Sequence, residues 1–276
     1  MTDIGAWRAE VVDHRRAEGP PPFERARPAG EPLARRHGVA VHGGAGAITA
    51  VDAGNRPLWT HACAGRPNAA HISGDRVLVT TDSLEYTPWG FLGPALLLDL
   101  STGRLVAELR GERGAARGGG RFLLGLEGYG IFETREYDGE GSETARWPSY
   151  GHYVVGSGVR VVEADRRVPT QGRVVRLLPD GVVGPGPALS DPQPPKPVVL
   201  PDGTLLVLDR HLLRAVDRDL ATTVLAELTP LTDSRTIRAL RRDGAHLVAT
   251  FAEPSPAHPV RYTVDTWTLR LSPAGA

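Results

Sequence analysis

Three sets of residues have types and spacings that could do chemistry, and the first surrounds His258. Glu253 lies five residues before this histidine and Arg261 three residues after it. A histidine beside a carboxylate is a candidate general acid–base pair or a candidate metal-binding pair, and Arg261 is a further candidate catalytic residue. The alternative is a turn stiffened by the prolines of EPSPAHP, and the proline content favours that alternative.

The second set consists of aromatic residues in a segment without a clear strand pattern. Tyr86, Trp89 and Phe91 lie in Thr81–Pro94 (TDSLEYTPWGFLGP), which we expect to be a long loop. Aromatic side chains on a loop often anchor a ligand or a protein partner. The alternative is a loop that folds down onto its own sheet, and the sequence leaves both interpretations open.

The third set is Arg166, Arg167 and Gln171, within the segment Asp165–Gly172 (DRRVPTQG). Two guanidinium groups and an amide could bind an anionic group. A solvated loop explains the same residues more simply, and we favour it.

Linear motifs for metals, cofactors or a nucleophile are missing from the sequence. The nine histidines include no H-x-H or H-x-x-x-H pair. The segment HGGAG (42–46) resembles an oxyanion loop, but no G-x-S-x-G accompanies it. The single cysteine, Cys63, excludes an internal disulfide. The sequence therefore predicts neither a metal site nor a cofactor.

Charge and composition narrow the range of partners. The 276 residues contain 32 basic and 32 acidic side chains, so the formal net charge is zero. This balance argues against a domain that binds nucleic acid or an anionic membrane by broad attraction. The N-terminal residues lack the apolar core of a signal peptide. We therefore expect a soluble, cytoplasmic protein whose partner is a protein or a small molecule.

The elements that must position these residues are short strands. From Gly38 onward, strand-like runs recur about every ten residues, as in sandwiches, barrels and propellers, and no segment has a convincing amphipathic helical pattern. A unit of apolar strand, polar turn and apolar strand recurs about every 40 residues, the length of a four-stranded propeller blade. The turns of its copies contain Asp52, Asp99, Asp138, Asp180 and Asp217. We predict an all-β fold, a single β-propeller of six four-stranded blades, with seven possible.

The chain ends differ from the repeats. Residues 1–36 include the proline-rich run AEGPPPFERARPAGEP, and we interpret them as an N-terminal arm beside a propeller of residues 37–276. The last blade has only three predicted strands, Thr236–Leu240, His246–Phe251 and Arg261–Leu271. We expect the arm to supply the missing outer strand through Ala6–Val12 and so to close the ring.

The best-preserved copy of the unit is Gly38–Thr60 (GVAVHGGAGAITAVDAGNRPLWT). Its ending, with Ala50, Val51, Asp52, Ala53, Leu58 and Trp59, resembles the PQQ-like propeller repeat, a relative of the WD40-like repeats. The resemblance implies a propeller fold. It does not imply a bound quinone, because the quinone-dependent enzymes of that superfamily have about eight blades and often a pair of adjacent cysteines.

Two functions remain open on this fold. In a propeller, the loops between strands two and three and between blades rise on one face, where a ligand or partner can bind. The first function is a non-catalytic propeller that binds a protein or small ligand on this face. The alternative is a small enzyme of secondary metabolism, of the lyase, cyclase or hydrolase type, with its pocket at the mouth of the central channel.

Overall fold

The computed structural model describes residues 7–19, 30–229, 237–256 and 261–274. These residues form 25 β-strands and one short 3-10 helix, Pro179–Gly181. The strands assemble into six antiparallel sheets of four strands each, with one extra strand in the fourth sheet. The number of sheets confirms the prediction of six four-stranded units. Within the described ranges, no helix is long and apolar enough to cross a membrane.

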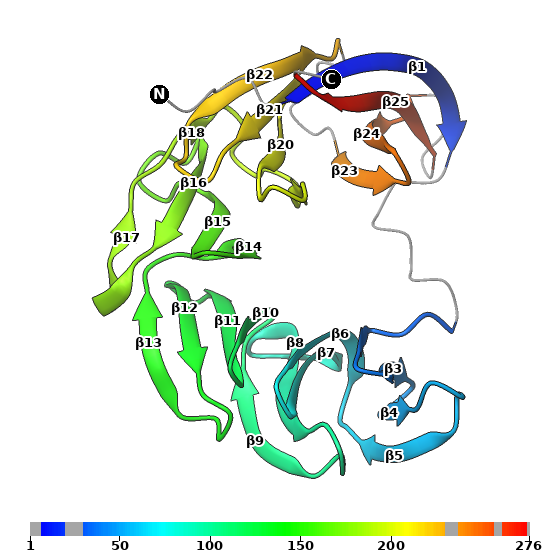
Figure 1. Cartoon of the computed structure of the whole chain (residues 1–276), viewed down its shortest axis with the longest axis vertical. Coiled ribbons are helices and arrows are strands. Elements are labelled where there is room, and N and C mark those ends of the chain that lie inside the picture. The colour runs from blue at the N-terminus through cyan, green and yellow to red at the C-terminus, as the bar shows by residue number, and fades with distance from the viewer. Residues whose placement is uncertain (1–6, 20–29, 230–236, 257–260, 275–276) are drawn as a thin grey trace. The chain divides into compact units, whose positions relative to one another are not determined.

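The chain divides into two compact units. The first unit is Pro28–Val161 with Arg176–Gly184, and the second unit is the remainder. Three sheets of the first unit follow one another (Figure 1). The first sheet consists of β2 (Ala34–Arg36), β3 (Val39–Gly44), β4 (Ala47–Val51) and β5 (Pro57–Ala62). The second sheet consists of β6 (Arg66–Ser73), β7 (Arg76–Thr87), β8 (Gly90–Asp99) and β9 (Leu105–Arg110). The third sheet consists of β10 (Arg113–Gly118), β11 (Arg121–Gly128), β12 (Ile131–Tyr137) and β13 (Glu143–Trp147).

The other three sheets have the same up-and-down order. The boundary between the two units crosses β15 and β16 of the fourth sheet, in which β18 also pairs with β16. The fourth sheet consists of β14 (Gly151–Val155), β15 (Val159–Ala164), β16 (Gly172–Leu177), β17 (Val183–Gly184) and β18 (Ala188–Leu189). The fifth sheet consists of β19 (Val198–Val199), β20 (Leu205–Asp209), β21 (Leu212–Val216) and β22 (Thr222–Glu227). The sixth sheet consists of β23 (Ile237–Asp243), β24 (His246–Pro254), β25 (Tyr262–Pro273) and β1 (Trp7–Gly19).

Sheets that are covered on both faces explain the continuous apolar runs of the sequence. In β8, Leu96 and Leu98 pack into a core shared with the first sheet, whereas Ala95 and Leu97 pack into a core shared with the third. All four side chains are buried. Because both faces are covered, the strand has no alternation of apolar and polar residues.

The repeated aspartates hold tight turns. In Asp52, Asp138 and Asp217, Oδ1 accepts hydrogen bonds from the backbone N–H groups two and four residues further on. Asp99 accepts from the N–H groups two and three residues on. Asp180 differs, because it lies in the 3-10 helix with a φ of 59°. The aspartates therefore have a local structural role.

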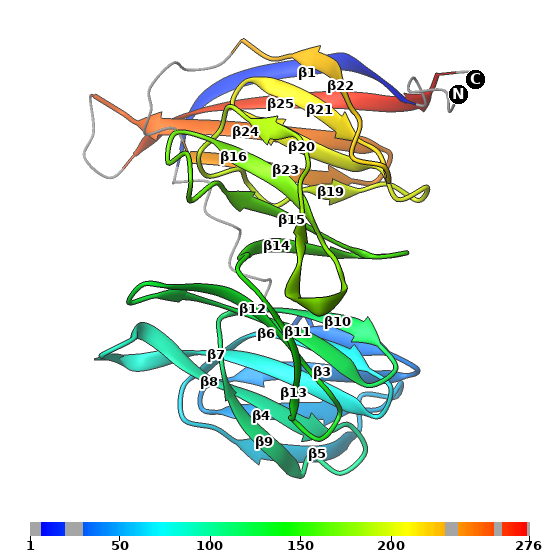
Figure 2. The same cartoon turned by 90° about the vertical axis from the view of Figure 1, so that its left-hand side faces the viewer.

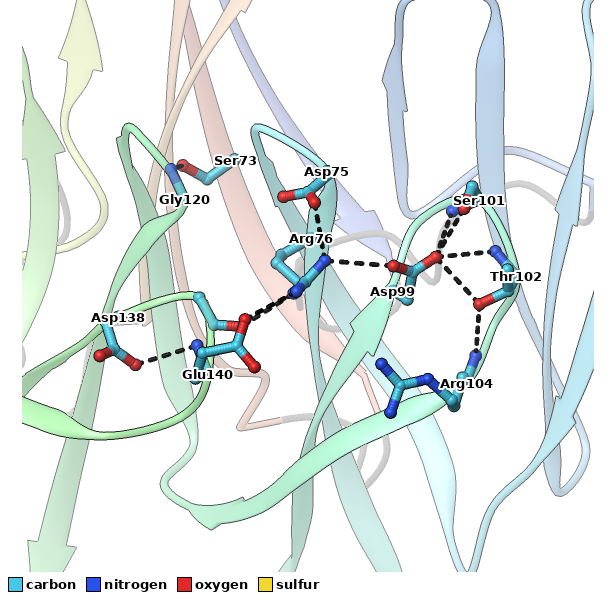
Figure 3. A network of polar contacts seen from close by, with 11 residues as sticks. Ser73, Asp75, Arg76, Asp99, Ser101, Thr102, Arg104, Gly120, Asp138 and Glu140 are labelled. Atoms are coloured by element: carbon cyan, nitrogen blue, oxygen red, sulfur yellow. Dashed lines mark hydrogen bonds and ion pairs between the residues drawn. The ribbon is translucent and has the colours of Figure 1, made fainter.

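Arg76 joins the second and third sheets at the end of β7 that lies opposite the β7–β8 turn (Figure 3). Its Nε donates to the carbonyl of Gly139 at 2.8 Å, and its two terminal nitrogens contact Asp75, Asp99 and Glu140 at 2.8, 3.1 and 2.8 Å. Arg76 thus ties the turns of the two sheets together at this end.

The N-terminal strand lies at the outer edge of the sixth sheet. β1 pairs with β25 from Trp7 opposite Pro273 to Gly19 opposite Tyr262. It is longer than the expected segment Ala6–Val12, of which Ala6 lies outside the described residues. The closure of the sheets into one ring and the division at residue 36 stay predictions.

Charged side chains reinforce the β1–β25 pairing. The carboxylate of Asp265 is buried and accepts two hydrogen bonds from the Arg16 guanidinium, each with an N···O distance of 2.8 Å. His14 Nε2 lies 3.2 Å from Asp265 Oδ1. The His14 ring stacks on Trp267 with a centroid distance of 3.9 Å. The bond from Arg16 lowers the pKa of Asp265, which is therefore held as an anion.

Candidate functional site

The segment expected to be a loop, Thr81–Pro94, is a β-hairpin. Strands β7 and β8 run on beyond the other strands of their sheet, and the hairpin projects from the first unit (Figure 2). Asp82 pairs with Leu92 and Thr87 with Gly90, with an irregular register between these pairs. We call Asp82–Leu92 the ribbon. The prediction of a loop was wrong because the ribbon extends past the repeating sheet, so the pattern of the repeat did not include it.

The turn of the ribbon is held by one hydroxyl group. Thr87 Oγ1 accepts a hydrogen bond from the N–H of Trp89 at 3.1 Å and donates to the carbonyl of Gly90 at 3.0 Å. Gly90 has a φ of 69°, a conformation that glycine adopts without steric cost. These contacts fix the position of Trp89 at the tip.

Two of the three predicted aromatic residues are exposed on the ribbon. Tyr86 is 77% exposed and Phe91 is 62% exposed. Their rings meet edge to face with a centroid distance of 5.6 Å. Leu84, two residues before Tyr86, is 74% exposed. The ribbon therefore presents apolar side chains to solvent instead of folding them onto its own sheet.

Trp89, the third aromatic residue, is partly buried between two neighbours. Its ring meets Tyr129, in the turn between β11 and β12, edge to face at 5.1 Å, and the guanidinium of Arg110 lies 5.1 Å from its centroid. Tyr129 has a φ of 48° between Gly128 and Gly130. A tyrosine rarely adopts this conformation, and such backbone strain tends to occur at functional sites.

A cavity of about 640 Å³ lies beside Trp89 in the first unit. Its lining comes from β7, β8, β9, β11, β12 and the β7–β8 turn, and the apolar residues in it include Pro88, Leu92, Pro94, Leu109, Leu126 and Ile131. No lining residue belongs to β6 or β10, the first strands of the two sheets. In a propeller the first strands line the channel. The cavity therefore differs in position from the channel-mouth pocket expected of an enzyme.

Three charged residues, Glu108, Arg110 and Arg135, belong to the cavity lining, and their ion-pair partners differ. Arg135 forms a hydrogen-bonded ion pair with Glu133 and lies 3.7 Å from Glu143. Arg110 and Glu108 are exposed and have no ion-pair partner among the described residues. Glu108 pairs with Leu96, which packs toward the first sheet, so its side chain lies on the face of β9 opposite to that of Leu109.

The predicted basic set lies in the second unit. Arg166, Arg167 and Gln171 are exposed in the connection between β15 and β16. The N–H of Arg167 donates to Asp165 Oδ1 at 2.9 Å, and the N–H of Gln171 donates to the carbonyl of Val168 at 2.9 Å. The segment is an ordered surface turn. Binding of an anion there stays a prediction.

The predicted acid–base set is described only in part. His258 lies outside the described residues. Glu253 was expected in a loop but lies in β24, where it pairs with Thr263. Arg261 accepts a hydrogen bond from the N–H of Ser255 through its carbonyl at 2.9 Å. The loop is shorter than expected because β24 continues to Pro254. A catalytic role for these residues stays a prediction.

Sequence reasoning missed a buried charge network in the second unit. Asp191 Oδ1 accepts from Arg238 at 2.8 Å and from the N–H of Gln193 at 2.9 Å. Asp209 accepts from the N–H of Asp191 at 2.8 Å and from Arg214 at 2.7 Å. Burial raises the pKa of Asp191, and Arg238 opposes that shift. No local spacing connects these residues, so the sequence contained no signal for the network.

Over the part of the chain that the structure describes, no group of three or more His, Cys, Asp or Glu side chains has an arrangement that could hold a metal ion.

Six four-stranded antiparallel sheets in a repeating up-and-down order define a β-propeller protein. No family model matches the chain, and no curated protein matches it in sequence. Similar solved structures include BamB from Moraxella catarrhalis, which is 17% identical over 83% of this chain and 79% of that one, with a TM-score of 0.48.

Two further similar structures are enzymes by name. A catalytically inactive virginiamycin B lyase from Staphylococcus aureus, with quinupristin, is 10% identical over 94% of this chain and 99% of that one, with a TM-score of 0.49. A quinohemoprotein alcohol dehydrogenase from Pseudomonas putida HK5 is 11% identical over 80% of this chain, with a TM-score of 0.47, and this chain covers 51% of its length. These likenesses concern the fold only.

Proposed function

We propose that this protein is a non-catalytic β-propeller that binds a protein partner, and that the ribbon is its docking element. The exposure of Leu84, Tyr86 and Phe91 is the observation that supports this function. Together these side chains expose on the order of 400 Å² of largely apolar surface, a patch size that is often functional on a soluble monomer. Exposed aromatic side chains are also typical anchors of protein interfaces.

The backbone of the ribbon offers a second means of binding. Beyond Asp82, β7 has no described pairing with β6, and before Pro94, β8 has none with β9. Unpaired strand edges can accept an extended segment of a partner by forming main-chain hydrogen bonds. Apolar anchors would then supply affinity, and the edge would set the direction of the bound segment.

The alternative of a lyase, cyclase or hydrolase has less support. General acid–base catalysis needs a positioned acid or base at the reacting group. The cavity beside Trp89 has one carboxylate in its lining, Glu108, and that side chain is exposed. No arrangement among the described residues favours the enzyme over the binding module.

The proposal is tested by site-specific crosslinking in the producing cells. A photoreactive amino acid replaces Glu85, an exposed residue on the ribbon, and in a matched control it replaces Val224, which is exposed on β22. We expect a defined protein to crosslink from position 85 and not from position 224.

The captured protein is then purified, and its affinity is measured by titration calorimetry. The double substitution Tyr86→Ala and Phe91→Ala should weaken binding about 30-fold or more, because central aromatic anchors contribute about 2 kcal/mol or more. Val224→Ala should leave the affinity unchanged. Equal crosslinking from both positions, or an affinity that the double substitution does not alter, would refute the proposal. So would chemical turnover of the captured molecule.

A further inference from the structure

We propose that the protein partner binds as an extended strand along the free edge of β8, with a large apolar side chain in the cavity beside Trp89 and an acidic side chain at Arg110. This inference rests on the proposed function and deepens it. It assigns the partner to one of the two edges of the ribbon, and it specifies which residues the docked segment must contain.

The edge of β8 becomes free next to the cavity. β9 ends at Arg110, which pairs with Pro94, whereas β8 begins four residues earlier, at Gly90. Residues around this step belong to the cavity lining, namely Gly93, Pro94, Leu109 and Arg110. A strand that continued the line of β9 along β8 would therefore lie beside the cavity.

Two apolar side chains of the second sheet face the third sheet across the cavity. Leu109 pairs with Ala95, and both pack into the core shared with the third sheet. Asp82 lies on the same face of β7 as Leu78 of that core, because residues four positions apart in a strand share a face. Leu92 pairs with Asp82 and therefore lies on this face as well.

The opposite wall of the cavity comes from the third sheet. Leu126 lies on the same face of β11 as Leu124, which packs against the second sheet. Ile131 pairs with Gly128, two residues beyond Leu126, and so it lies on that face too. The cavity is thus an apolar slot between the two sheets, next to the free edge of β8.

The slot fits an apolar side chain of an added strand. Alternate side chains of a strand point to the same face, so every second residue of the segment would face the third sheet, as Leu109 does. The slot volume of about 640 Å³ is within the range of roughly 300–1,000 Å³ for binding sites. Burial of a leucine or aromatic side chain there would stabilise the complex in proportion to the apolar area removed from water.

The charges of the lining specify the neighbouring residue of the segment. The Arg110 guanidinium lies 5.1 Å from the centroid of the Trp89 ring and has no ion-pair partner among the described residues. Arg135, the other cation of the lining, forms an ion pair with Glu133. A carboxylate near the end of β9 would give Arg110 a partner, so the segment carries an acidic residue there.

Crosslinking from position 129 tests where the segment lies. Tyr129 is exposed in the turn between β11 and β12, and its ring contacts Trp89 beside the slot. A photoreactive amino acid at this position should capture the same protein as position 85. Mass spectrometry of the product then identifies the crosslinked segment, which should contain an acidic residue close to a large apolar one. A synthetic peptide of that segment is the probe for calorimetry and hydrogen exchange.

Two substitutions at one position test the slot by titration calorimetry. Ile131→Trp fills the slot and should weaken binding of the peptide about 30-fold or more, the loss expected when a central anchor cannot dock. Ile131→Val is the matched control, because it keeps the slot open and should leave the affinity nearly unchanged. Leu109→Trp fills the slot from the opposite wall and should act as Ile131→Trp does. Urea unfolding identifies which of these variants are folded.

A substitution on each side tests the charge. Arg110→Gln should weaken binding of the peptide about fivefold, the upper range for an exposed ion pair. The loss should disappear when the acidic residue of the peptide is replaced by its amide. Arg104→Gln, an exposed arginine of the same sheet outside the cavity lining, is the matched control and should change nothing.

Hydrogen exchange measured by NMR distinguishes the two edges of the ribbon. When the peptide binds, exchange of backbone amides within residues 90–93 of β8 should slow, because the added strand forms main-chain hydrogen bonds there. Amides of residues 83–87 on β7 should slow less.

Three results would overturn the inference: no crosslink from position 129 to the protein captured from position 85, equal affinity of the peptide for the unmodified protein and the folded slot-filling variants, or slowed exchange confined to β7. In each case, capture from position 85 and its dependence on Tyr86 and Phe91 would still support the docking role of the ribbon. Failure to capture any protein from position 85 would refute both proposals.

Discussion

Protonation of Asp99 should cost the protein a measurable part of its stability in acid. Oδ1 of this carboxylate accepts hydrogen bonds from the N–H and hydroxyl of Ser101 at 3.0 and 2.7 Å and from the N–H and hydroxyl of Thr102 at 3.0 and 2.9 Å. Oδ2 accepts from Arg76 at 3.1 Å (Figure 3). The hydrogen bond from the Ser101 hydroxyl makes the largest contribution to lowering the pKa of Asp99. Partial burial alone would raise this pKa, but together the hydrogen bonds lower it to about 2.

The size of the effect follows from linkage between protonation and folding. The pKa falls from 3.8 in the unfolded chain to about 2 in the folded protein. At about 1.4 kcal/mol per pKa unit, this shift stabilises the folded state by about 2 kcal/mol. Because the folded-state pKa is the lower one, the stabilisation is complete well above pH 3.8 and is lost as the pH falls through about 2.

The assay is urea unfolding of the unmodified protein and of Asp99→Asn at several pH values. Asparagine keeps an acceptor oxygen but cannot ionise. The unmodified protein should be more stable by about 2 kcal/mol at pH 6, by about half of that at pH 3, and by little at pH 2. The difference between the two proteins cancels the contributions of other carboxylates.

Asp75→Asn is the matched control, because Asp75 contacts the same arginine but is 78% exposed. It should cost no more than about 0.5 kcal/mol at any of these pH values. A difference between the unmodified protein and Asp99→Asn that stays constant from pH 6 to pH 3 would refute the reasoning. A difference as small as that of the control would do so as well.

Four further substitutions test backbone strain, a buried hydrogen bond and an ion pair by urea unfolding. Gly103→Ala should lower the free energy of unfolding by about 3 kcal/mol, because φ is 70° and the new Cβ would lie 2.5 Å from the Trp59 ring. Gly118→Ala, with a φ of 90° and no atom within 4 Å of the new Cβ, should lower it by about 1 kcal/mol. Equal losses of stability in the two variants would contradict this account. Trp147→Phe should cost about 1 kcal/mol, because it removes an indole hydrogen bond of 2.6 Å to a backbone carbonyl. Asp265→Asn should lower the free energy of unfolding by about 2 kcal/mol at neutral pH and by less in acid, because the pKa of this buried carboxyl is lowered by its ion pair with Arg16. A loss of stability that does not depend on pH would count against this ion pair.

The repeating strands and their turns could be predicted because their causes are local. Strands β15 and β21 follow the repeating pattern of short apolar runs. Each combines a short apolar run with a following turn that contains an aspartate or glycine. A carboxylate that accepts hydrogen bonds from N–H groups two to four residues on needs no distant partner, so the aspartates marked the turns.

The ribbon and its cavity could be predicted only in part. The sequence singled out Tyr86, Trp89 and Phe91 because aromatic residues stood in a segment that breaks the repeat. It did not predict that the segment forms paired strands, and it did not distinguish the exposed pair from the partly buried Trp89. Arg110 was not a candidate, since its importance depends on contact with a ring 21 residues earlier in the chain.

The sequence by itself determined the class of fold, because periodic apolar runs and turn residues act over a few positions and recur about every 40 residues. It also determined which segments interrupt that pattern. Only the tertiary structure decided which charges form ion pairs. Arg135 is neutralised by Glu133 and Asp191 by Arg238, whereas Arg110 has no ion-pair partner among the described residues and lies against Trp89. The physical reason is that ion pairing and cavity formation depend on distances between atoms far apart in the chain, and no local pattern records those distances.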